Sequence, residues 1–389
     1  MKVLSKILLV MLCAMLLPLS AVAEENARVM PEPYASATFT DPSEIPYPAE
    51  RDENGYLLPG TVATSMRLID EATGDMESYE TEGEFVYENP AQGLWAYLSP
   101  TLQVQIIQYD GSWADGEGKK PLAQRWFLAD VKFDVTAESF ERHRWYQEDV
   151  TGMDVLGKLQ KNGVTRGDFA DQAIWPKTLA QCDRMVFAVN GDFYLGRVSS
   201  KQPTGNILRS GEVLYDVKPG SKLSFPDLDS AAFFPDGSMK VFDTEETTAT
   251  EQQALGARDM VSFGPWLVRD GVLRDYTGNF YDHRDPRMAI GMVEPGHYVI
   301  IDSEGHIPKD GPQGLTLNEL GALLYYNGAN EAINMDGGNT SVMIFMGEKL
   351  NRTGKVTVIT TPRNQNELFG VGKSEQVRTD WANGDPKKK

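Results

Sequence analysis

The sequence predicts an α+β fold with a mixed, largely antiparallel sheet and helices packed against it. Short alternating or apolar segments typical of strands outnumber the segments with helical period. Few helices connect these strands, which favours antiparallel pairing of neighbours. The pair Asp236-Gly237, which is typical of hairpin turns, separates two short apolar runs and predicts a β-hairpin there.

The first 23 residues have the pattern of a secretory signal peptide. Lys2 and Lys6 flank the start, an apolar run extends from Ile7 to Leu19, and the small residues at Ala21–Ala23 are typical of a cleavage site. The run is short for a membrane span, so an uncleaved anchor is the weaker alternative. We therefore expect a secreted or cell-envelope protein, cleaved after Ala23, without a membrane span in the mature chain.

The net charge and the number of cysteines limit which partners and which covalent cross-links the chain is expected to have. The formal net charge is −19, and cleavage after residue 23 would remove Lys2 and Lys6 and leave −21. So acidic a chain would repel nucleic acid and anionic membranes, whereas a neutral glycan meets no such barrier. A polyanionic substrate would need a few local Arg or Lys residues, or a bridging cation. Cys182 would be the only cysteine of the mature chain, so no internal disulfide is expected.

Four segments are expected after the signal peptide. Six prolines and many acidic residues make 24–60 a linker. Residues 61–94 contain a few strand-like pieces and are interpreted as a small appended segment, with disorder as the alternative. The folded domain is expected over 95–375 and a Lys-rich tail over 376–389.

Within the domain, the expected elements follow at short intervals. Leu102–Tyr109 and Gln124–Asp134 alternate in polarity and predict a hairpin. Asp168–Gln181 has a helical pattern that Pro176 interrupts. Further strands are expected at Arg184–Val189, Ala231–Phe234, Met239–Phe242, His297–Ile301, Val342–Phe345 and Leu368–Val371.

A helix is predicted near the start of the most distinctive stretch, which runs from Gly314 to Ser341. Thr316 and Glu319 have the spacing of a capping box, and leucines recur at helical period after them. The helix is expected over Leu317–Asn327, with Gly328 as its left-handed C-cap. A Glu at this helical position is commonly a cap, and a catalytic role is the alternative.

A buried strand and a polar turn complete this stretch. Ala332–Met335 leads directly to Asp336, and Gly337-Gly338 follows. Because glycines have no side chain, a substrate or a neighbouring backbone can come close there. The sequence therefore predicts an acid presented in an open niche, although Asp-Gly and Gly-Asn are also ordinary hairpin-turn pairs.

Other polar residues follow apolar strands in the same way. Asn190 and Asp192 could bind hydroxyls or a metal, and Tyr194 could stack on a sugar; an Asx turn is the alternative. Arg209 could contact a phosphate or simply lie on the surface. Trp266 could form a sugar platform or pack in the core.

Arg287 belongs to a charged segment, 281–291, that leads into a strand. So many charged residues are costly to bury without a purpose. An arginine is suited to clamp a phosphate through two parallel hydrogen bonds.

Five motifs in order resemble the signature of the phosphodiester glycosidase family, which includes the enzyme that uncovers mannose 6-phosphate on lysosomal hydrolases. They are Asn190-Gly-Asp-Phe-Tyr, Phe263-Gly-Pro, Arg287-Met-Ala-Ile-Gly, Thr316-Leu-Asn-Glu-Leu and Asp336-Gly-Gly, within residues 95–373. The chain departs from the family at Asn339-Thr-Ser, where a third Gly and two Ser are usual. It matches the late Arg-Pro-Val segment only loosely, at Pro362-Arg363.

The resemblance implies a secreted glycosidase that hydrolyses a sugar-1-phosphodiester, or a related linkage, in a cell-envelope or extracellular glycan. Asp336 and Glu319 would then be the catalytic carboxylates and Arg287 the phosphate clamp. Substrate contacts are expected from Asn190, Asp192, Tyr194, Arg209, Thr316, Gly337, Gly338 and Ser341. The alternative is a non-catalytic carbohydrate-binding or exopolysaccharide-assembly module of the same fold.

No cofactor is expected with certainty. A divalent cation, Ca²⁺ or Mg²⁺, could bind the hard oxygen ligands of Asp192 and Asp302. The expected partner is a glycan or sugar phosphate, and nucleic acid is not expected.

Overall fold

The structure of the chain is a computed structural model. It describes residues 65–69, 76–113, 118–135, 146–147, 175–182, 184–193, 204–218, 220, 227–276, 282–307, 311–352, 363, 365 and 367–379. The predicted signal peptide (1–23), the predicted linker (24–60) and Tyr194 lie outside the described residues.

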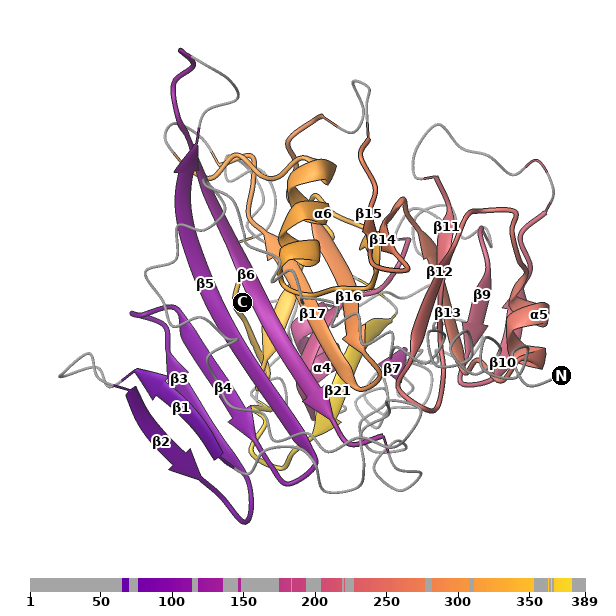
Figure 1. Ribbon diagram of the computed structural model, residues 1–389. Helices are drawn as coiled ribbons and strands as arrows, with labels where there is room; N and C mark the ends of the chain where they lie inside the picture. Colours follow the sequence, from indigo (N-terminus) through magenta and orange to yellow (C-terminus); the bar gives the residue numbers. More distant parts are fainter. Residues whose placement is uncertain are drawn as a thin grey trace, which may run out of the picture.

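A nine-stranded sheet is the largest element (Figure 1). Its strands in spatial order are β15 (Val272–Leu273), β14 (Trp266–Arg269), β18 (Glu331–Met335), β16 (Met288–Glu294), β17 (His297–Ser303), β6 (Leu122–Phe133), β5 (Leu102–Trp113), β4 (Leu94–Leu98) and β3 (Phe85–Asn89). β5 and β6 form the predicted hairpin, in register from Leu102 opposite Phe133 to Trp113 opposite Leu122.

A second sheet packs against one face of the first. It contains β20 (Glu348–Lys349), β19 (Met343–Phe345), β8 (Met185–Asn190), β21 (Leu368–Lys373) and β7 (Tyr146–Gln147). Side chains from both sheets, such as Phe127, Ile290, Phe187 and Phe345, share one buried core. Burial of these apolar side chains is the main force that holds the two layers together.

Two smaller sheets complete the strands. A five-stranded sheet contains β10 (Glu212–Tyr215), β9 (Ile207–Arg209), β13 (Asp259–Phe263), β11 (Asp229–Phe233) and β12 (Met239–Phe242), with the predicted β11–β12 hairpin. β1 (Ser65–Ile69) and β2 (Met76–Glu80) pair only with each other among the described strands.

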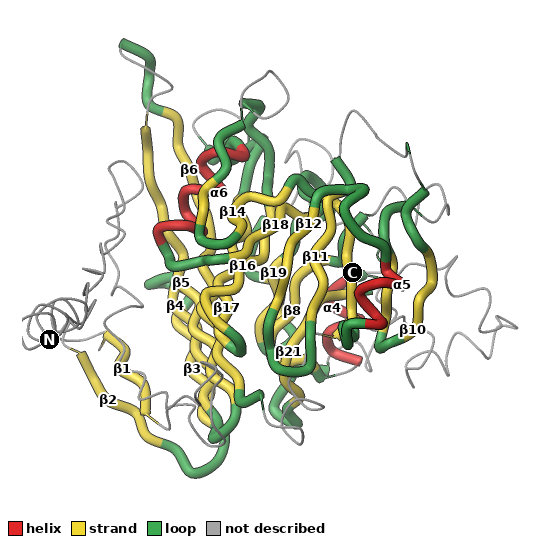
Figure 2. Tube along the Cα trace, turned by 45° about the vertical axis from the view of Figure 1, so that its right-hand side comes forward, coloured by secondary structure: helices red, strands yellow, loops and turns green. Residues whose placement is uncertain are grey.

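Helix α6 (Leu317–Tyr326) covers the other face of the nine-stranded sheet, where its leucines join a second apolar core (Figure 2). Its capping box between Thr316 and Glu319 is present as predicted, and Gly328 has the left-handed φ of 94° that the C-cap requires. The other described helices are short, α4 (Pro176–Cys182) and α5 (Ala249–Ala254).

The predicted α+β class overstates the helices, because the described part of the chain is mostly β. The expected antiparallel pairing is confirmed, but every pairing between described strands is antiparallel, so the sheets are not mixed. The physical reason is that short turns join several neighbouring strands, such as β11 with β12 and β16 with β17, and antiparallel neighbours need no helical crossover.

The main sheet also begins earlier than the expected domain start at residue 95. β3 pairs with β4 from Phe85 opposite Leu98 to Asn89 opposite Leu94, and β4 pairs in turn with β5. Part of the segment 61–94 therefore belongs to the sheet. The strand-like pieces of this segment did not reveal this, because most of β3 is only half-buried and its short sequence does not show which strand it pairs with.

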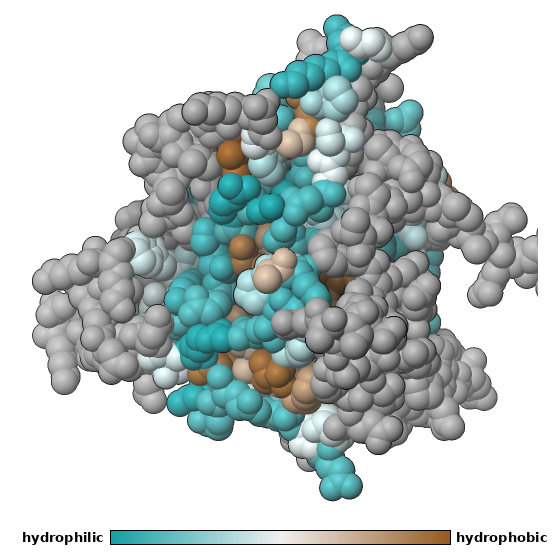
Figure 3. Space-filling model, turned by 90° about the vertical axis from the view of Figure 1, so that its left-hand side faces the viewer, coloured by the Kyte–Doolittle hydropathy of each residue, from teal (hydrophilic) through white to brown (hydrophobic). Residues whose placement is uncertain are grey.

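The face on the β5 side of the molecule is largely hydrophilic among its described residues, with apolar residues in separate spots (Figure 3). This agrees with the excess of 56 Asp and Glu over 37 Lys and Arg. None of the helices in the described ranges has the length and apolar character needed to cross a membrane.

Candidate active site

The polar turn after β18 connects the two main sheets. β18 ends at Met335 in the nine-stranded sheet and β19 begins at Met343 in the second sheet, so residues 336–342 cross between them. Asn190, at the end of β8, holds this crossing. Its Nδ2 donates to the carbonyl of Asp336 at 2.8 Å, and its Oδ1 accepts the N–H of Val342 at 3.1 Å. The amide that we predicted to bind a substrate thus positions the Asp336 turn.

Strand register places Arg287 beside Asp336. Met288 of β16 lies opposite Met335 of β18, so the next residues beyond this pair are Arg287 and Asp336. Both are almost completely buried, with exposed fractions of 4% and 8%. These two predicted catalytic residues therefore lie at the same end of two neighbouring strands, although 49 positions of sequence separate them.

The glycines of the turn have different roles. A Cβ on Gly337 would collide with the carbonyl oxygen of Pro286, so only glycine permits this close approach. Gly338 donates its N–H to the same carbonyl at 2.9 Å. A Cβ on Gly338 would meet no atom within 4 Å, so open space lies beside it. The close neighbour at Gly337 is therefore backbone, and the open side of the turn is at Gly338.

Some of the N–H donors of the Arg287 guanidinium are occupied by other groups of the protein. Nε donates to the carbonyl of Leu315 at 3.3 Å, and Nη2 donates to the carbonyl of His283 at 2.9 Å and lies 3.6 Å from Asp285 Oδ2. Burial lowers the pKa of Arg287 and Asp285 opposes this, but an arginine still carries its charge at neutral pH. Nη1 has no acceptor within the described part of the chain, and it can donate to an anionic ligand.

Arg209, the other arginine predicted to contact a phosphate, is saturated by the protein. Nε and Nη2 bond to Glu367 at 3.0 and 3.2 Å, Nη2 also bonds to Asp192 at 3.4 Å, and Nη1 donates to the carbonyls of Leu208 and Met260. Burial acts to lower the pKa of Arg209, but the two carboxylates outweigh it and raise that pKa. All of its N–H donors are occupied, which leaves none for a phosphate.

Asp192 belongs to the same buried group of charged side chains as Arg209 and Glu367. Its Oδ1 accepts the N–H of Phe193 at 2.7 Å and its Oδ2 accepts the N–H of Ser262 at 3.0 Å, in addition to Arg209. The side chain is fully buried. The bond to Phe193 reaches one residue on and not two, so it is not an Asx turn, but the protein itself supplies the partners of this carboxylate, which leaves little room for a sugar hydroxyl or a metal.

Glu319 is held by an ion pair. Its two oxygens accept Nη1 and Nη2 of Arg284 at 2.7 and 2.6 Å, and Oε2 also accepts the N–H of Thr316 at 2.9 Å. In return, the hydroxyl of Thr316 accepts the N–H of Glu319 at 3.2 Å. Thr316 and Glu319 therefore fix the start of α6 and the position of Arg284.

We expect Glu319→Gln to lower the free energy of unfolding by about 1–3 kcal/mol, because it removes a carboxylate from a nearly buried ion pair and weakens the cap. Urea unfolding measures this loss, and Thr316→Ala is the control that loses only the cap, at about 1 kcal/mol. A variant that keeps its stability but loses all hydrolysis would instead support the catalytic role predicted for Glu319.

Ser341 and Asp302 form a buried polar group behind the turn. Oδ1 of Asp302 accepts the hydroxyl of Ser341 at 3.0 Å and Nδ2 of Asn351 at 3.1 Å, while its Oδ2 has no hydrogen-bond partner among the described residues. Burial raises the pKa of Asp302 well above its usual range. A cation at Asp192 or Asp302 stays a prediction.

Two residues that sequence reasoning did not assign to the site also contact the turn. Arg363, an exposed residue, donates from Nη1 to the hydroxyl of Thr340 at 3.0 Å and from its N–H to the carbonyl of Asn339 at 2.9 Å. Gln365 accepts the N–H of Gly191 and donates to the carbonyl of Thr340, both at 3.1 Å. The loose match of Pro362-Arg363 to a family motif was a sequence signal that could have found Arg363. No sequence signal pointed to Gln365. Arg363 adds a second cation beside the turn.

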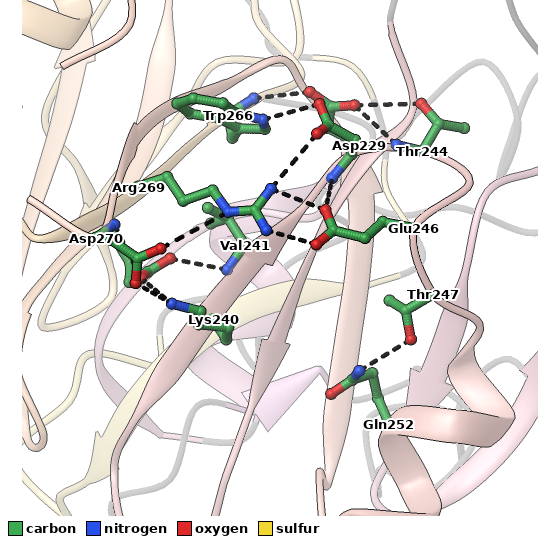
Figure 4. A network of polar contacts seen from close by, with 12 residues as sticks. Asp229, Lys240, Val241, Thr244, Glu246, Thr247, Gln252, Trp266, Arg269 and Asp270 are labelled. Atoms are coloured by element: carbon green, nitrogen blue, oxygen red, sulfur yellow. Dashed lines mark hydrogen bonds and ion pairs between the residues drawn. The ribbon is translucent and has the colours of Figure 1, made fainter. Parts of the chain in front are cut away.

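A separate cavity of about 340 Å³ is acidic. It is lined by Asp227, Asp229, Asp243, Thr244, Glu245, Glu246 and Arg274. Around it, Asp229 accepts the N–H groups of Trp266 at 3.2 Å and Thr244 at 3.0 Å, and Arg269 pairs with Glu246 (Figure 4). Burial raises the pKa of Asp229 to about 6. Since carboxylates outnumber arginine here, this cavity disfavours a phosphate.

Trp266, the residue suggested as a sugar platform, lies beside this cavity. The guanidinium of Arg274 is 4.5 Å from the centre of the Trp266 ring, a cation–π contact. The indole N–H donates to Asp243 at 3.0 Å. The protein therefore already engages both the ring and the N–H that a sugar would use.

Fold and site together define an antiparallel β protein whose strand ends bring an arginine and an aspartate side by side, suited to an anionic ligand. Residues 183–373 match the family model described as phosphodiester glycosidase, the family that the five motifs resemble.

Two further comparisons show what the chain is similar to in sequence and in fold. Over 177 residues, the chain is 30% identical to the SPbeta prophage-derived uncharacterized protein YomE of Bacillus subtilis (strain 168), which covers 45% of this chain and 26% of that protein. The chain thus spans about a quarter of this curated relative. The structure also resembles the catalytic domain of zebrafish N-acetylglucosamine-1-phosphodiester alpha-N-acetylglucosaminidase, auto-inhibited by its pro-peptide. The TM-score is 0.52, with 14% identity, over 85% of this chain and 95% of that domain. At this identity the likeness shows the fold alone.

Proposed function

We propose that this chain hydrolyses a sugar-1-phosphodiester at the bond between the anomeric carbon and the phosphate oxygen. The family match over residues 183–373 supports hydrolase chemistry of this type. The observation that carries the proposal is that Arg287 and Asp336 follow the last register pair of β16 and β18 at the same end of the sheet, with Nη1 of Arg287 available to a ligand.

Each group has a role that follows from its chemistry. A phosphate monoester leaves as a weak base, so neutralising its charge matters more than protonating it. Arg287 would bind the phosphate, and the exposed Arg363 could reach it from the other side of the turn. Asp336 would attack the anomeric carbon or activate water, with the sugar in the open space beside Gly338. Water is consumed, and the products are the free sugar and a phosphate monoester.

A non-catalytic carbohydrate-binding or exopolysaccharide-assembly module is the second candidate. The observation that favours it is the engagement of Glu319 by Arg284, because glycosidases generally use two carboxylates at the reacting centre. Both candidates act on a glycan outside the cytoplasm if residues 1–23 direct export, as their pattern predicts.

A comparison of two substrates with the same sugar tests the proposal. Wild type is expected to hydrolyse an activated sugar-1-phosphodiester much faster than the phosphate-free aryl glycoside. Arg287→Gln is expected to lower kcat/KM for the phosphodiester by about 10²–10³-fold, because a preorganised cation is lost. Arg125→Gln is the matched control, since Arg125 pairs with Asp110 on the surface of the long hairpin.

Three results would count against the proposal. Equal hydrolysis of both substrates would show that phosphate is not recognised. Binding of the sugar without turnover would support the binding module. A fully active Arg287→Gln variant would remove Arg287 from the site.

A further inference from the structure

Three potential metal ligands converge beside Arg287. One ligand atom each of His283, Asp285 and His306 lies within 4.8 Å of the other two. In the part of the chain that the structure describes, no other set of three His, Cys, Asp or Glu side chains meets in this way. The closest pair is Nε2 of His306 and Oδ1 of Asp285, 2.9 Å apart.

The backbone around this trio is fixed. Asp285 and Leu315 exchange two hydrogen bonds, at 3.2 and 3.0 Å, that tie the loop before β16 to the start of α6. A Cβ on Gly314 would collide with the backbone of Asp285, so a glycine is needed for this packing. Asp285 is therefore held in place by backbone contacts that do not use its carboxylate.

The two oxygens of Asp285 face different partners. Oδ1 faces His306, while Oδ2 lies 3.6 Å from Nη2 of Arg287. One carboxylate can therefore bind a metal ion through Oδ1 and still offset the charge of the neighbouring guanidinium through Oδ2. This division reduces the repulsion that a bound cation would otherwise feel from Arg287.

Two imidazoles and one carboxylate are a ligand set for first-row divalent metals, and Zn²⁺ in particular. Tetrahedral coordination at about 2.0–2.1 Å places ligand atoms about 3.3 Å apart. The pair of His306 and Asp285 already has nearly this spacing, and His283 is exposed, so its side chain can turn inward. Catalytic zinc sites have three protein ligands and an open fourth position.

We propose that His283, Asp285 and His306 bind one divalent transition-metal ion, with Zn²⁺ as the preferred metal and a coordination position open to solvent. This site differs from the Ca²⁺ or Mg²⁺ ligands expected at Asp192 and Asp302. It does not depend on the hydrolysis proposed above, because it concerns binding and not turnover.

Titration of the full chain tests the site. The protein, made without a histidine tag and freed of metal by a chelator, is titrated with Zn²⁺ by calorimetry and with Co²⁺ by visible absorption. Wild type is expected to bind one equivalent of metal. Its bound Co²⁺ should give the visible absorption bands that are typical of a low coordination number. His283→Ala and His306→Ala should each weaken Zn²⁺ binding by more than about 100-fold, because each removes a direct ligand.

His297→Ala is the matched control, because His297 pairs with Asp130 at the opposite end of β17 and should bind Zn²⁺ like wild type. Circular dichroism of the metal-free variants checks folding, and the exposed His283 provides a variant that does not disturb the core. The proposal is overturned if wild type binds no Zn²⁺ at millimolar concentration. It is also overturned if both histidine variants bind as tightly as the control. In either case His306 serves only as a hydrogen-bond partner of Asp285 and of the Arg284 carbonyl, which lies 3.1 Å from its Nε2.

Discussion

Asp336→Asn is expected to lower kcat for hydrolysis of a sugar-1-phosphodiester by about 10³-fold or more, while the protein stays folded. The reason is that an amide can neither attack the anomeric carbon nor accept a proton from water. The turn should survive the change, because two bonds hold the backbone of Asp336. Its carbonyl accepts Nδ2 of Asn190 at 2.8 Å, and its N–H donates to the carbonyl of Asp192 at 3.2 Å.

Single-turnover kinetics and thermal unfolding of the same preparations measure the two parts of this expectation. Asp110→Asn serves as the matched control, since Asp110 lies exposed on the long hairpin and pairs with Arg125. Full activity in a folded Asp336→Asn variant would exclude Asp336 from the reaction. The Arg287 proposal could then stand only as a binding site for the phosphate.

Arg209→Met is expected to lower the free energy of unfolding by about 3–5 kcal/mol, enough to unfold a marginally stable domain. The substitution leaves the carboxylates of Asp192 and Glu367 buried without their counter-ion, and these side chains are only 0% and 11% exposed. The loss should appear in urea unfolding followed by circular dichroism, whatever substrate is offered.

A triple variant separates the lost charge balance from the lost packing. Arg209→Met combined with Asp192→Asn and Glu367→Gln removes all three charges, and part of the stability should return. If Arg209→Met alone keeps its stability but raises KM for the phosphodiester, Arg209 contacts the phosphate as the sequence suggested. The internal ion cluster would then have no structural importance.

Local patterns predicted many elements correctly because short-range physics determines them. The spacing of Thr316 and Glu319 predicted the capping box of α6, and Gly328 predicted its left-handed end. Asp236-Gly237 predicted the β11–β12 turn. The same patterns did not show how little of the chain is helical, nor that β3 joins the main sheet, since a half-buried edge strand has weak periodicity.

The order of the family motifs was also visible in the sequence, and the family match over residues 183–373 confirms the resemblance. Motif order identified Arg287 and Asp336 as candidates. It did not show that they would be neighbours, because that depends on the pairing of β16 with β18.

By itself, then, the sequence determined the strand patterns, the cap of α6 and the acid after β18, since each depends on residues close together in the chain, and the order of five motifs indicated the family. Only the tertiary structure decided which charged groups remain for a ligand. Arg209 meets Glu367 across 158 positions and Glu319 meets Arg284 across 35. Burial of a charge demands a partner, and that partner is chosen by strand register and packing, which no local pattern records.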